Sequence, residues 1–282
     1  MSDVIPKVSV VIPAYNNAAY LAEAIESVLA QTYPDLELII ADHSSADLSA
    51  EIAAGYAGDS RVRLLEPTPA GGGAARNWNR VSEAARGTYL KLLCGDDILE
   101  PEALSRQVAA LDANPSAVIA AARRRLIDAH GAVFLGGRGL NGLRDLVPGE
   151  DAIRATVRAG TNLFGEPGSV LFRRSVLAET GWWDATNPYL IDQATYVRVL
   201  HHGDLWASAD VLASFRLTGS QWSARLIGQQ AGQAIAFHHR ERAANPGRIS
   251  AADVALGDLN ARKTAVMRRA SYLVLGSKRL SR

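Results

Sequence analysis

Short apolar runs alternate with stretches of helical spacing over the first hundred residues. Apolar side chains recur three or four residues apart between the runs, as on the buried face of a helix. The runs themselves are apolar on both faces, which is typical of buried parallel strands. We expect strands at residues 7–13, 36–41, 61–65 and 89–93, and helices at 18–31, from 47 to about 56, and at 74–86. This alternation predicts a parallel sheet with right-handed crossovers.

The second half of the chain is less regular. The glycine-rich stretch from Arg123 to Gly149 contains strand-like fragments and receives no assignment. From about Ser220 the composition is helical, with a break at Pro246-Gly247. We expect further helices at 101–112, 151–159 and 191–201 and strands at 117–122 and 169–172. The pattern therefore predicts an α/β domain over residues 1–218 and a helical C-terminal extension over 219–282.

Composition and charge exclude several classes of protein. The 282 residues are enough to bury one large core. Lys and Arg number 30 against 29 Asp and Glu, so no overall field favours a nucleic acid partner. The one cysteine, Cys94, excludes an internal disulfide and a cysteine-rich metal site, which fits a reducing compartment. With no secretory signal and no long apolar run, we expect a cytoplasmic protein.

Two adjacent carboxylates, Asp96 and Asp97, follow the fourth apolar run and precede a helix that begins near Pro101. Like charges at this spacing repel one another unless a cation or hydrogen-bond donors neutralise them. A divalent ion that carries substrate phosphates, Mg²⁺ or Mn²⁺, is one such cation. A helix N-cap with a solvated neighbour is the alternative interpretation.

Polar residues also follow the first two strands, as Tyr15-Asn16-Asn17 and Asp42-His43-Ser44-Ser45. Because the carboxyl ends of parallel strands share one edge, we expect these residues to converge with Asp96 and Asp97. The segment from Gly71 to Asn77 adds glycines that permit close backbone approach, and Arg76 near a helix N-terminus. Each cluster alone fits a cap, a turn or a surface arginine. Together the four clusters favour a nucleoside-diphosphate site.

These motifs resemble the family 2 glycosyltransferases, which are inverting enzymes of the GT-A fold that use nucleoside-diphosphate sugars. The resemblance runs from Val8 to about Leu104, and its motifs are Val10–Asn16, Ser27–Tyr33, Leu38–Asp47, Ala75–Asn77 and Leu93–Asp97. It implies an α/β fold with a GT-A-type, Rossmann-like, mostly parallel sheet flanked by helices. It also implies that residues 1–218 are the catalytic domain, with the nucleotide-binding half at about 1–100 and the acceptor half at about 101–218.

The same resemblance implies which residues bind the nucleotide sugar. Asp42 would contact the base, Arg76 the diphosphate and Asp96 the divalent metal. Asp97 would lie on the sugar side or behind the metal ligand. The full nucleotide-binding set that it implies is Pro13, Tyr15, Asn16, Asp42, Ser45, Arg76 and Asp96.

The acceptor half resembles the family more weakly, through Gly165–Arg174, Gly181–Asp184 and Tyr189–Arg198. The first of these segments, which contains Glu166, resembles the one flanking the acceptor pocket, and the third implies that Asp192 is the general base. A carboxylate there would accept the proton of the attacking acceptor hydroxyl, although an ordinary helix cap is the alternative.

Trp182 and Trp183 lie in the second acceptor-side segment, Gly181–Asp184. Flat apolar rings suit the faces of sugar rings, so either side chain could stack on the acceptor. Burial in the core is the alternative for both residues.

The chain departs from the family pattern at four positions. His43, Cys94 and Ile191 stand where the family often has an acid, and Thr218 stands where it often has a histidine. Cys94 would then be either a soft metal ligand or buried filler.

Two hypotheses stay open. One is an inverting transferase that acts on a hydroxyl of a glycan or lipid-linked acceptor in cell-surface polysaccharide synthesis. The other is a degenerate GT-A module that binds a nucleotide or glycan without catalysis.

The stretch from Arg262 to Arg282 has seven Lys or Arg residues and no acid. An interfacial helix on anionic lipid would have this composition, and so would a solvated tail. The first alternative would place the protein peripherally at the inner face of the membrane. The helical C-terminal region could also pair subunits, so a homo-oligomer stays open.

Overall fold

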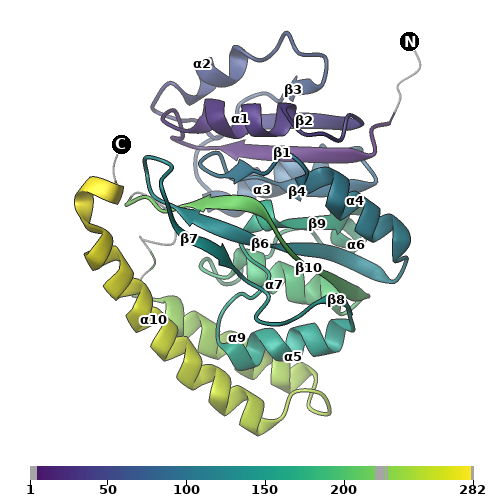
Figure 1. The fold of residues 1–282 in the computed structure, drawn as a ribbon, viewed down its shortest axis with the longest axis vertical. Coiled ribbons are helices and arrows are strands. Elements are labelled where there is room, and N and C mark those ends of the chain that lie inside the picture. Colours follow the sequence, from purple (N-terminus) through teal and green to yellow (C-terminus); the bar gives the residue numbers. More distant parts are fainter. Residues whose placement is uncertain (1–4, 220–225, 227, 281–282) are drawn as a thin grey trace.

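One ten-stranded sheet runs through the part of the chain that the structure describes, and helices cover both of its faces (Figure 1). The structure is a computed structural model that describes residues 5–219, 226 and 228–280, apart from the side chains of 271–278. The predicted α/β fold, with a sheet flanked by helices, is confirmed.

The first half is a parallel sheet, as the sequence pattern predicts. In its centre, Val8 pairs with Leu36 on one side and with Tyr89 on the other. The four strands are β1 (Val8–Ala14), β2 (Leu36–Asp42), β3 (Val62–Leu64) and β4 (Tyr89–Leu92). The helices between them are α1 (Leu21–Leu29), α2 (Ser49–Ala54) and α3 (Gly73–Glu83).

The second half mixes parallel and antiparallel pairing. Its strands are β5 (Ile98–Leu99), β6 (Ala117–Ile127), β7 (Val133–Arg138), β8 (Asp145–Val147), β9 (Val170–Arg173) and β10 (Asp204–Arg216). Its helices are α4 (Ala103–Ala113), α5 (Gly149–Ala159), the 3₁₀ turn η1 (Pro167–Ser169), α6 (Arg174–Glu179) and α7 (Ile191–Leu200). The strand order is β3-β2-β1-β4-β9-β6-β10-β5, in which β9 is antiparallel to both neighbours. The sequence pattern missed β5, β10 and α6, whereas β7 and β8 lie in the stretch with strand-like fragments that it left unassigned.

The sheet separates two hydrophobic cores, and alternation along β1 assigns its residues to both. Val10 and Ile12 pack with Leu21 and Ile25 of α1, whereas Val11 packs in the opposite core. This division follows from the two-residue period of a strand, which turns successive side chains to opposite faces. Helices on both faces leave β1 fully buried, which explains why its sequence is apolar throughout.

The C-terminal extension packs against the α/β domain through α5. It contains α9 (Gln230–Ala244) and α10 (Ala251–Leu280), with the predicted break at Pro246-Gly247 between them. A side chain at Gly257 of α10 would lie 2.2 Å from the carbonyl oxygen of Val157 in α5, so α10 and α5 cross at a glycine. Residues 220–225 and 227, which the sequence pattern includes in this helical region, lie outside the described residues.

A buried carboxylate strengthens this contact. Asp253 of α10 is 1% exposed and accepts hydrogen bonds from Arg154 and Arg158 of α5. Although burial raises the pKa of Asp253, these hydrogen bonds outweigh it and leave the pKa well below its ordinary value.

None of the described helices is long and apolar enough to span a bilayer.

Candidate active site

A cleft of about 580 Å³ lies at the carboxyl ends of β1, β2 and β4. Of the residues to which the family resemblance assigns a binding or catalytic role, those that line it are Pro13, Tyr15, Asn16, Asp96, Glu166 and Asp192. They come from both halves of the α/β domain. The predicted convergence of the three strand ends is therefore present, and the proposed general base lies in the same cleft.

The turns after β1 and β2 are hydrogen-bonded to each other. The backbone N–H of Asn16 donates to Ser45 Oγ at 2.9 Å, and Asn16 Oδ1 accepts from the N–H of Ala46 at 2.8 Å. Asn16 and Ser44 have φ values of 50° and 53°, a left-handed conformation that asparagine tolerates better than most residues. These contacts hold the two turns as one wall of the cleft.

Asp42 and Ser45 are not among the residues that line the cleft, whereas His43 and Ser44 between them are. The Ser45 N–H donates to Asp42 Oδ2 at 2.9 Å. Asp42 Oδ1 is buried and has no hydrogen-bond partner among the described residues. Because a buried acceptor without a donor is unfavourable, this oxygen is suited to a donor group of a ligand.

The glycine-rich segment lines the cleft, but Arg76 does not. Gly71, Gly73 and Asn77 are lining residues. Arg76 is exposed on α3, and its Nη1 donates to the carbonyl oxygen of Ala70 at 3.2 Å. At the N-terminus of α3 the glycines, rather than the arginine, therefore face the cleft.

Asp96 and Asp97 point in different directions from one tight turn. Asp96 lines the cleft, whereas Asp97 is 2% exposed and accepts a hydrogen bond from the backbone N–H of Arg216 at 3.0 Å. Burial, and then the charge of Asp96, raise the pKa of Asp97 well above its ordinary value. Asp97 is thus placed behind the cleft surface and not on its sugar side.

The ligand atoms of Cys94, Asp96 and Asp97 lie within 4.8 Å of one another. Two crowded carboxylates fit a divalent cation, because the cation would offset the repulsion that, together with the larger effect of burial, raises the pKa of Asp97. Burial, and then the charges of Asp97 and Asp96, raise the pKa of the Cys94 thiol, so this sulfur is a protonated and poor ligand for a hard ion. The donor set therefore fits Mg²⁺ or Mn²⁺ through Asp96.

Arg216, at the end of β10, holds this turn from behind. Its side chain is 1% exposed, and its Nε donates to the backbone carbonyl of Asp96 at 2.9 Å. Its Nη2 donates to Glu23 of α1 at 2.7 Å, and its guanidinium lies 4.6 Å from the ring centroid of Tyr20. Arg216 thus joins β10, α1 and the Asp96-Asp97 turn, a link between residues far apart in sequence that the pattern of the chain does not reveal.

Asp192 lies in the first turn of α7 and does not cap the helix, because the N-cap residue is Leu190. Its Oδ2 accepts a hydrogen bond from the side-chain amide of Asn162 at 2.9 Å, and its Oδ1 accepts one from the N–H of Gln193 at 2.7 Å. Burial raises its pKa to about 7, with a smaller contribution from the charge of Glu166. A carboxylate with this pKa accepts protons near neutral pH, as a general base must.

Glu166 forms an ion pair with Arg124 of β6 in the same cleft. Arg124 Nε lies 2.5 Å from Glu166 Oε2, and Arg124 Nη2 donates to Glu166 Oε1 at 3.1 Å. Burial raises the pKa of Glu166, but the guanidinium outweighs it and leaves the pKa below its ordinary value. Glu166 is therefore a charged, paired group, which distinguishes it from Asp192. The Arg123-Arg124-Arg125 run inside a buried strand is the sequence signal that could have indicated this pair.

The suggested stacking of the two tryptophans on an acceptor is not supported. Trp183 is 2% exposed, its Nε1–H donates to Ser82 Oγ at 2.9 Å, and its ring meets Phe172 edge-on at 5.6 Å. Trp182 packs beside the same core, with Arg174 over its ring. Neither ring lines the cleft. The core interpretation holds for Trp183 because its only polar atom is already satisfied inside the protein.

The C-terminal extension supplies the far wall of the cleft, a contribution that the sequence did not predict. Gln230 and Ala234 of α9 line it, as do Thr264 and Arg268 of α10. Arg268 Nη2 donates to Thr161 Oγ1 at 3.1 Å.

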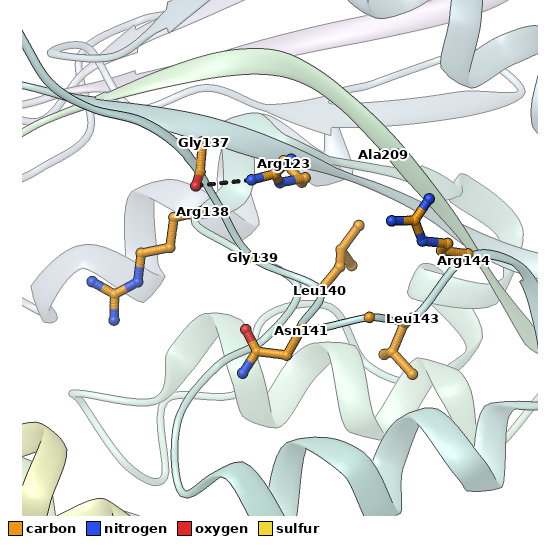
Figure 2. Close-up of a pocket in the computed structure, with 10 residues that line it drawn as sticks. Arg123, Gly137, Arg138, Gly139, Leu140, Asn141, Leu143, Arg144 and Ala209 are labelled. Atoms are coloured by element: carbon orange, nitrogen blue, oxygen red, sulfur yellow. Dashed lines mark hydrogen bonds between the residues drawn. The ribbon is translucent and has the colours of Figure 1, made fainter.

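A second cavity, of about 410 Å³, lies along residues 137–144 (Figure 2). Arg123 donates there to the carbonyl oxygen of Gly137, and Arg138 points away from Arg123. Arg138 lines this cavity and the larger cleft as well.

Two solved structures share the fold of this chain. The chain resembles the mannosyltransferase PcManGT from Pyrobaculum calidifontis, solved with GDP-Man and Mn²⁺, with a TM-score of 0.66 and 19% identity over 98% of this chain and 77% of that one. It resembles TarS of S. aureus, solved with UDP-GlcNAc, with a TM-score of 0.64 and 16% identity over 81% of this chain and 66% of that one. At these identities the likeness shows the fold.

Sequence relatives carry the identification further. Over 111 residues the chain is 40% identical to the glycosyltransferase GlyG of Streptococcus pneumoniae, a match that covers 38% of this chain and 36% of GlyG. It spans less than two thirds of the length of other curated relatives as well. The family profile of glycosyl transferase family 2 matches residues 9–181, which is more than half of the chain. This chain therefore belongs to glycosyl transferase family 2.

Proposed function

We propose that this chain transfers a sugar, with inversion, from a nucleoside-diphosphate sugar to a hydroxyl of a glycan or lipid-linked acceptor in cell-surface polysaccharide synthesis. The observation that carries the proposal is that Asp96 and Asp192, from opposite halves of the domain, line the same cleft. Asp96 is suited to the side of the leaving group and Asp192 to the side of the acceptor.

On the donor side, the nucleoside would lie against the turns after β1 and β2. Tyr15 and His43 present their rings there with centroids 5.8 Å apart. The buried Asp42 Oδ1, which has no partner among the described residues, supports a contact with the base or ribose. The backbone N–H groups at the start of α3 favour the diphosphate.

Asp96 would hold the divalent metal beside the diphosphate, with Asp97 and Arg216 fixing the turn from behind. When bound, this ion supplies Lewis-acid stabilisation of the negative charge that develops on the departing diphosphate. PcManGT, whose structure contains Mn²⁺, supports the choice of a divalent ion for this chain.

On the acceptor side, Asp192 would remove the proton of the attacking hydroxyl. The hydroxyl oxygen forms a bond to the anomeric carbon from the face opposite the diphosphate, and the bond between that carbon and the phosphate oxygen breaks in the same step. The proton remains on Asp192, and the electron pair leaves with the nucleoside diphosphate. This single displacement inverts the anomeric centre and needs no second nucleophile. The raised pKa of Asp192 supports its role as the base.

A non-catalytic GT-A module is the second candidate. Cys94, where many family members have an acid, favours it, because the metal site then has one carboxylate fewer facing the donor. Thr218, a cleft-lining residue where the family often has histidine, favours it too.

The test is a panel of nucleotide sugars, including UDP-GlcNAc and GDP-Man, assayed for nucleoside-diphosphate release with Mn²⁺, Mg²⁺ or EDTA. Calorimetry with UDP and GDP measures binding in parallel. Metal-dependent release of one nucleoside diphosphate supports the transferase. Nucleotide binding with no release from any donor, with and without oligosaccharide or lipid-phosphate acceptors, supports the module.

A further inference from the structure

The outer face of α10 exposes large apolar side chains that no described residue covers. Leu256, Leu259, Val266 and Met267 are 39, 53, 65 and 67% exposed, respectively. They recur at helical spacing, so they form one continuous stripe. Figure 1 shows α10 along the edge of the molecule, with α5 and α9 on its inner side. Scattered exposed leucines are ordinary, but four large apolar residues on one helix face mark an interaction surface.

Two cations, Arg262 and Lys263, lie in the middle of this stripe. Both are exposed, and neither makes an ion pair with another described residue. The two acids of α10 are engaged elsewhere: Asp253 is buried against α5, and Asp258 bonds His238 and His239. We define the outer face as Leu256, Leu259, Arg262, Lys263, Val266 and Met267. Four of these residues are apolar, and the only charges among them are positive.

We propose that this outer face docks on an anionic lipid surface. Apolar side chains would enter the boundary between headgroups and acyl chains. The long stems of Arg262 and Lys263 would follow them, with the charged ends reaching back to the lipid phosphates. The exposed apolar stripe, rather than the basic composition alone, separates this arrangement from a solvated tail.

A second copy of the chain is a poorer occupant of the same face. In a two-fold dimer each face packs against itself. Because Arg262 and Lys263 lie at the centre of the stripe, a pairing centred there would bring four cations together, and like charges at an interface oppose association. An anionic surface complements the same cations.

The position of α10 connects this face to the cleft. Its opposite side supplies Ala261, Thr264, Ala265 and Arg268 to the cleft wall. A membrane on the outer face would therefore lie one helix away from the region that takes the acceptor. The docking inference itself does not depend on the proposed reaction, since it rests on exposure and charge.

The experiment is co-sedimentation of the full chain with vesicles, one set of pure phosphatidylcholine and one of equal parts phosphatidylcholine and phosphatidylglycerol. We expect binding to the anionic vesicles that weakens with salt, and little binding to the neutral ones. The double variant Leu259→Glu/Val266→Glu should lose more than about tenfold in partition. Arg262→Gln/Lys263→Gln should lose roughly fivefold for each cation removed.

Matched controls carry the same charge changes elsewhere. Leu48→Glu/Leu146→Glu alters two leucines that are 64 and 43% exposed outside α10, and Arg144→Gln/Arg242→Gln removes two exposed arginines. Both should bind vesicles like the parent. Equal binding of all variants, equal binding to neutral vesicles, or no binding at all would overturn the proposal. So would a dimer in light scattering that Leu259→Glu/Val266→Glu converts to a monomer.

Discussion

The side-chain amide of Asn162 donates one hydrogen bond to Asp192 Oδ2 at 2.9 Å and another to the carbonyl oxygen of Gly165 at 2.8 Å. One amide group therefore ties the proposed base to the loop that carries Glu166. Gly165 has a φ of 95°, a conformation that favours glycine, and a side chain there would lie 2.8 Å from Ser169 Oγ. The two carboxylates proposed for the acceptor side, Asp192 and Glu166, are thus positioned together.

Replacing Asp192 by Asn should remove the base without changing the shape of the site. We expect kcat to fall by about 10²- to 10⁴-fold, with the affinity for the nucleoside diphosphate unchanged. Asp151→Asn, at an exposed position in the first turn of α5, is the control. Nucleoside-diphosphate release measured by chromatography checks the change. A variant that turns over like the parent would rule out this role for Asp192.

The pH dependence should report the same carboxyl group. Since burial raises the pKa of Asp192 to about 7 and only the deprotonated form accepts a proton, kcat/KM should rise with pH and level off above about 7. Burial also lowers the pKa of the Lys91 ammonium to about 7, so that group titrates in the same range. The rise should persist in Lys91→Met. If the rise of kcat/KM with pH disappeared in Lys91→Met, that rise would be assigned to the lysine instead.

Metal dependence should reside in Asp96 and not in Cys94. Asp96→Asn should abolish the increase in melting temperature that Mn²⁺ together with a nucleoside diphosphate produces, because the cleft-facing carboxylate is lost. Cys94→Ser should keep most of it, since a protonated thiol contributes little to a hard ion. Thermal shift with Asp35→Asn, an exposed surface change, provides the reference. Loss of the shift in Cys94→Ser alone would reverse the assignment.

Arg216→Met should loosen the turn that presents Asp96. The methionine keeps the apolar stem but loses the bonds to the Asp96 carbonyl and to Glu23. We expect metal affinity to fall about 10- to 100-fold, as for residues that orient a metal ligand. Metal-free nucleotide binding should change much less. Calorimetric titration with Mn²⁺ measures the metal affinity. Equal losses of metal affinity and of metal-free nucleotide affinity would indicate general disruption.

Trp183→Ala should act on stability and not on the acceptor. Removing a buried ring that packs edge-on against Trp78, Phe172 and Tyr196 should cost about 3 to 5 kcal/mol in the free energy of unfolding. Trp182→Ala, at a partly exposed position, should cost less. Urea unfolding compares them. Near-parental stability of Trp183→Ala with a raised acceptor KM would restore the stacking hypothesis.

Much of the first half of the α/β domain could be predicted because its signals are local. A buried parallel strand is apolar over consecutive residues, as in β1 and β2, and the polar residues after it must lie at one edge of the sheet. The second half of the domain lacks such signals. β10 runs over 13 residues with polar positions and register shifts against β6, so its sequence has no clean period.

The sequence by itself determined the parallel α/β half, the family and the presence of Asp96 and Asp192 at element ends, since each follows from residues adjacent in the chain. Only the tertiary structure decided which side chains share the cleft. It turned Asp97 and Trp183 inward, left Arg76 on the surface, paired Glu166 with Arg124 and brought α10 to the far wall. Those outcomes depend on contacts between residues tens to hundreds of positions apart, and packing rather than local pattern selects them.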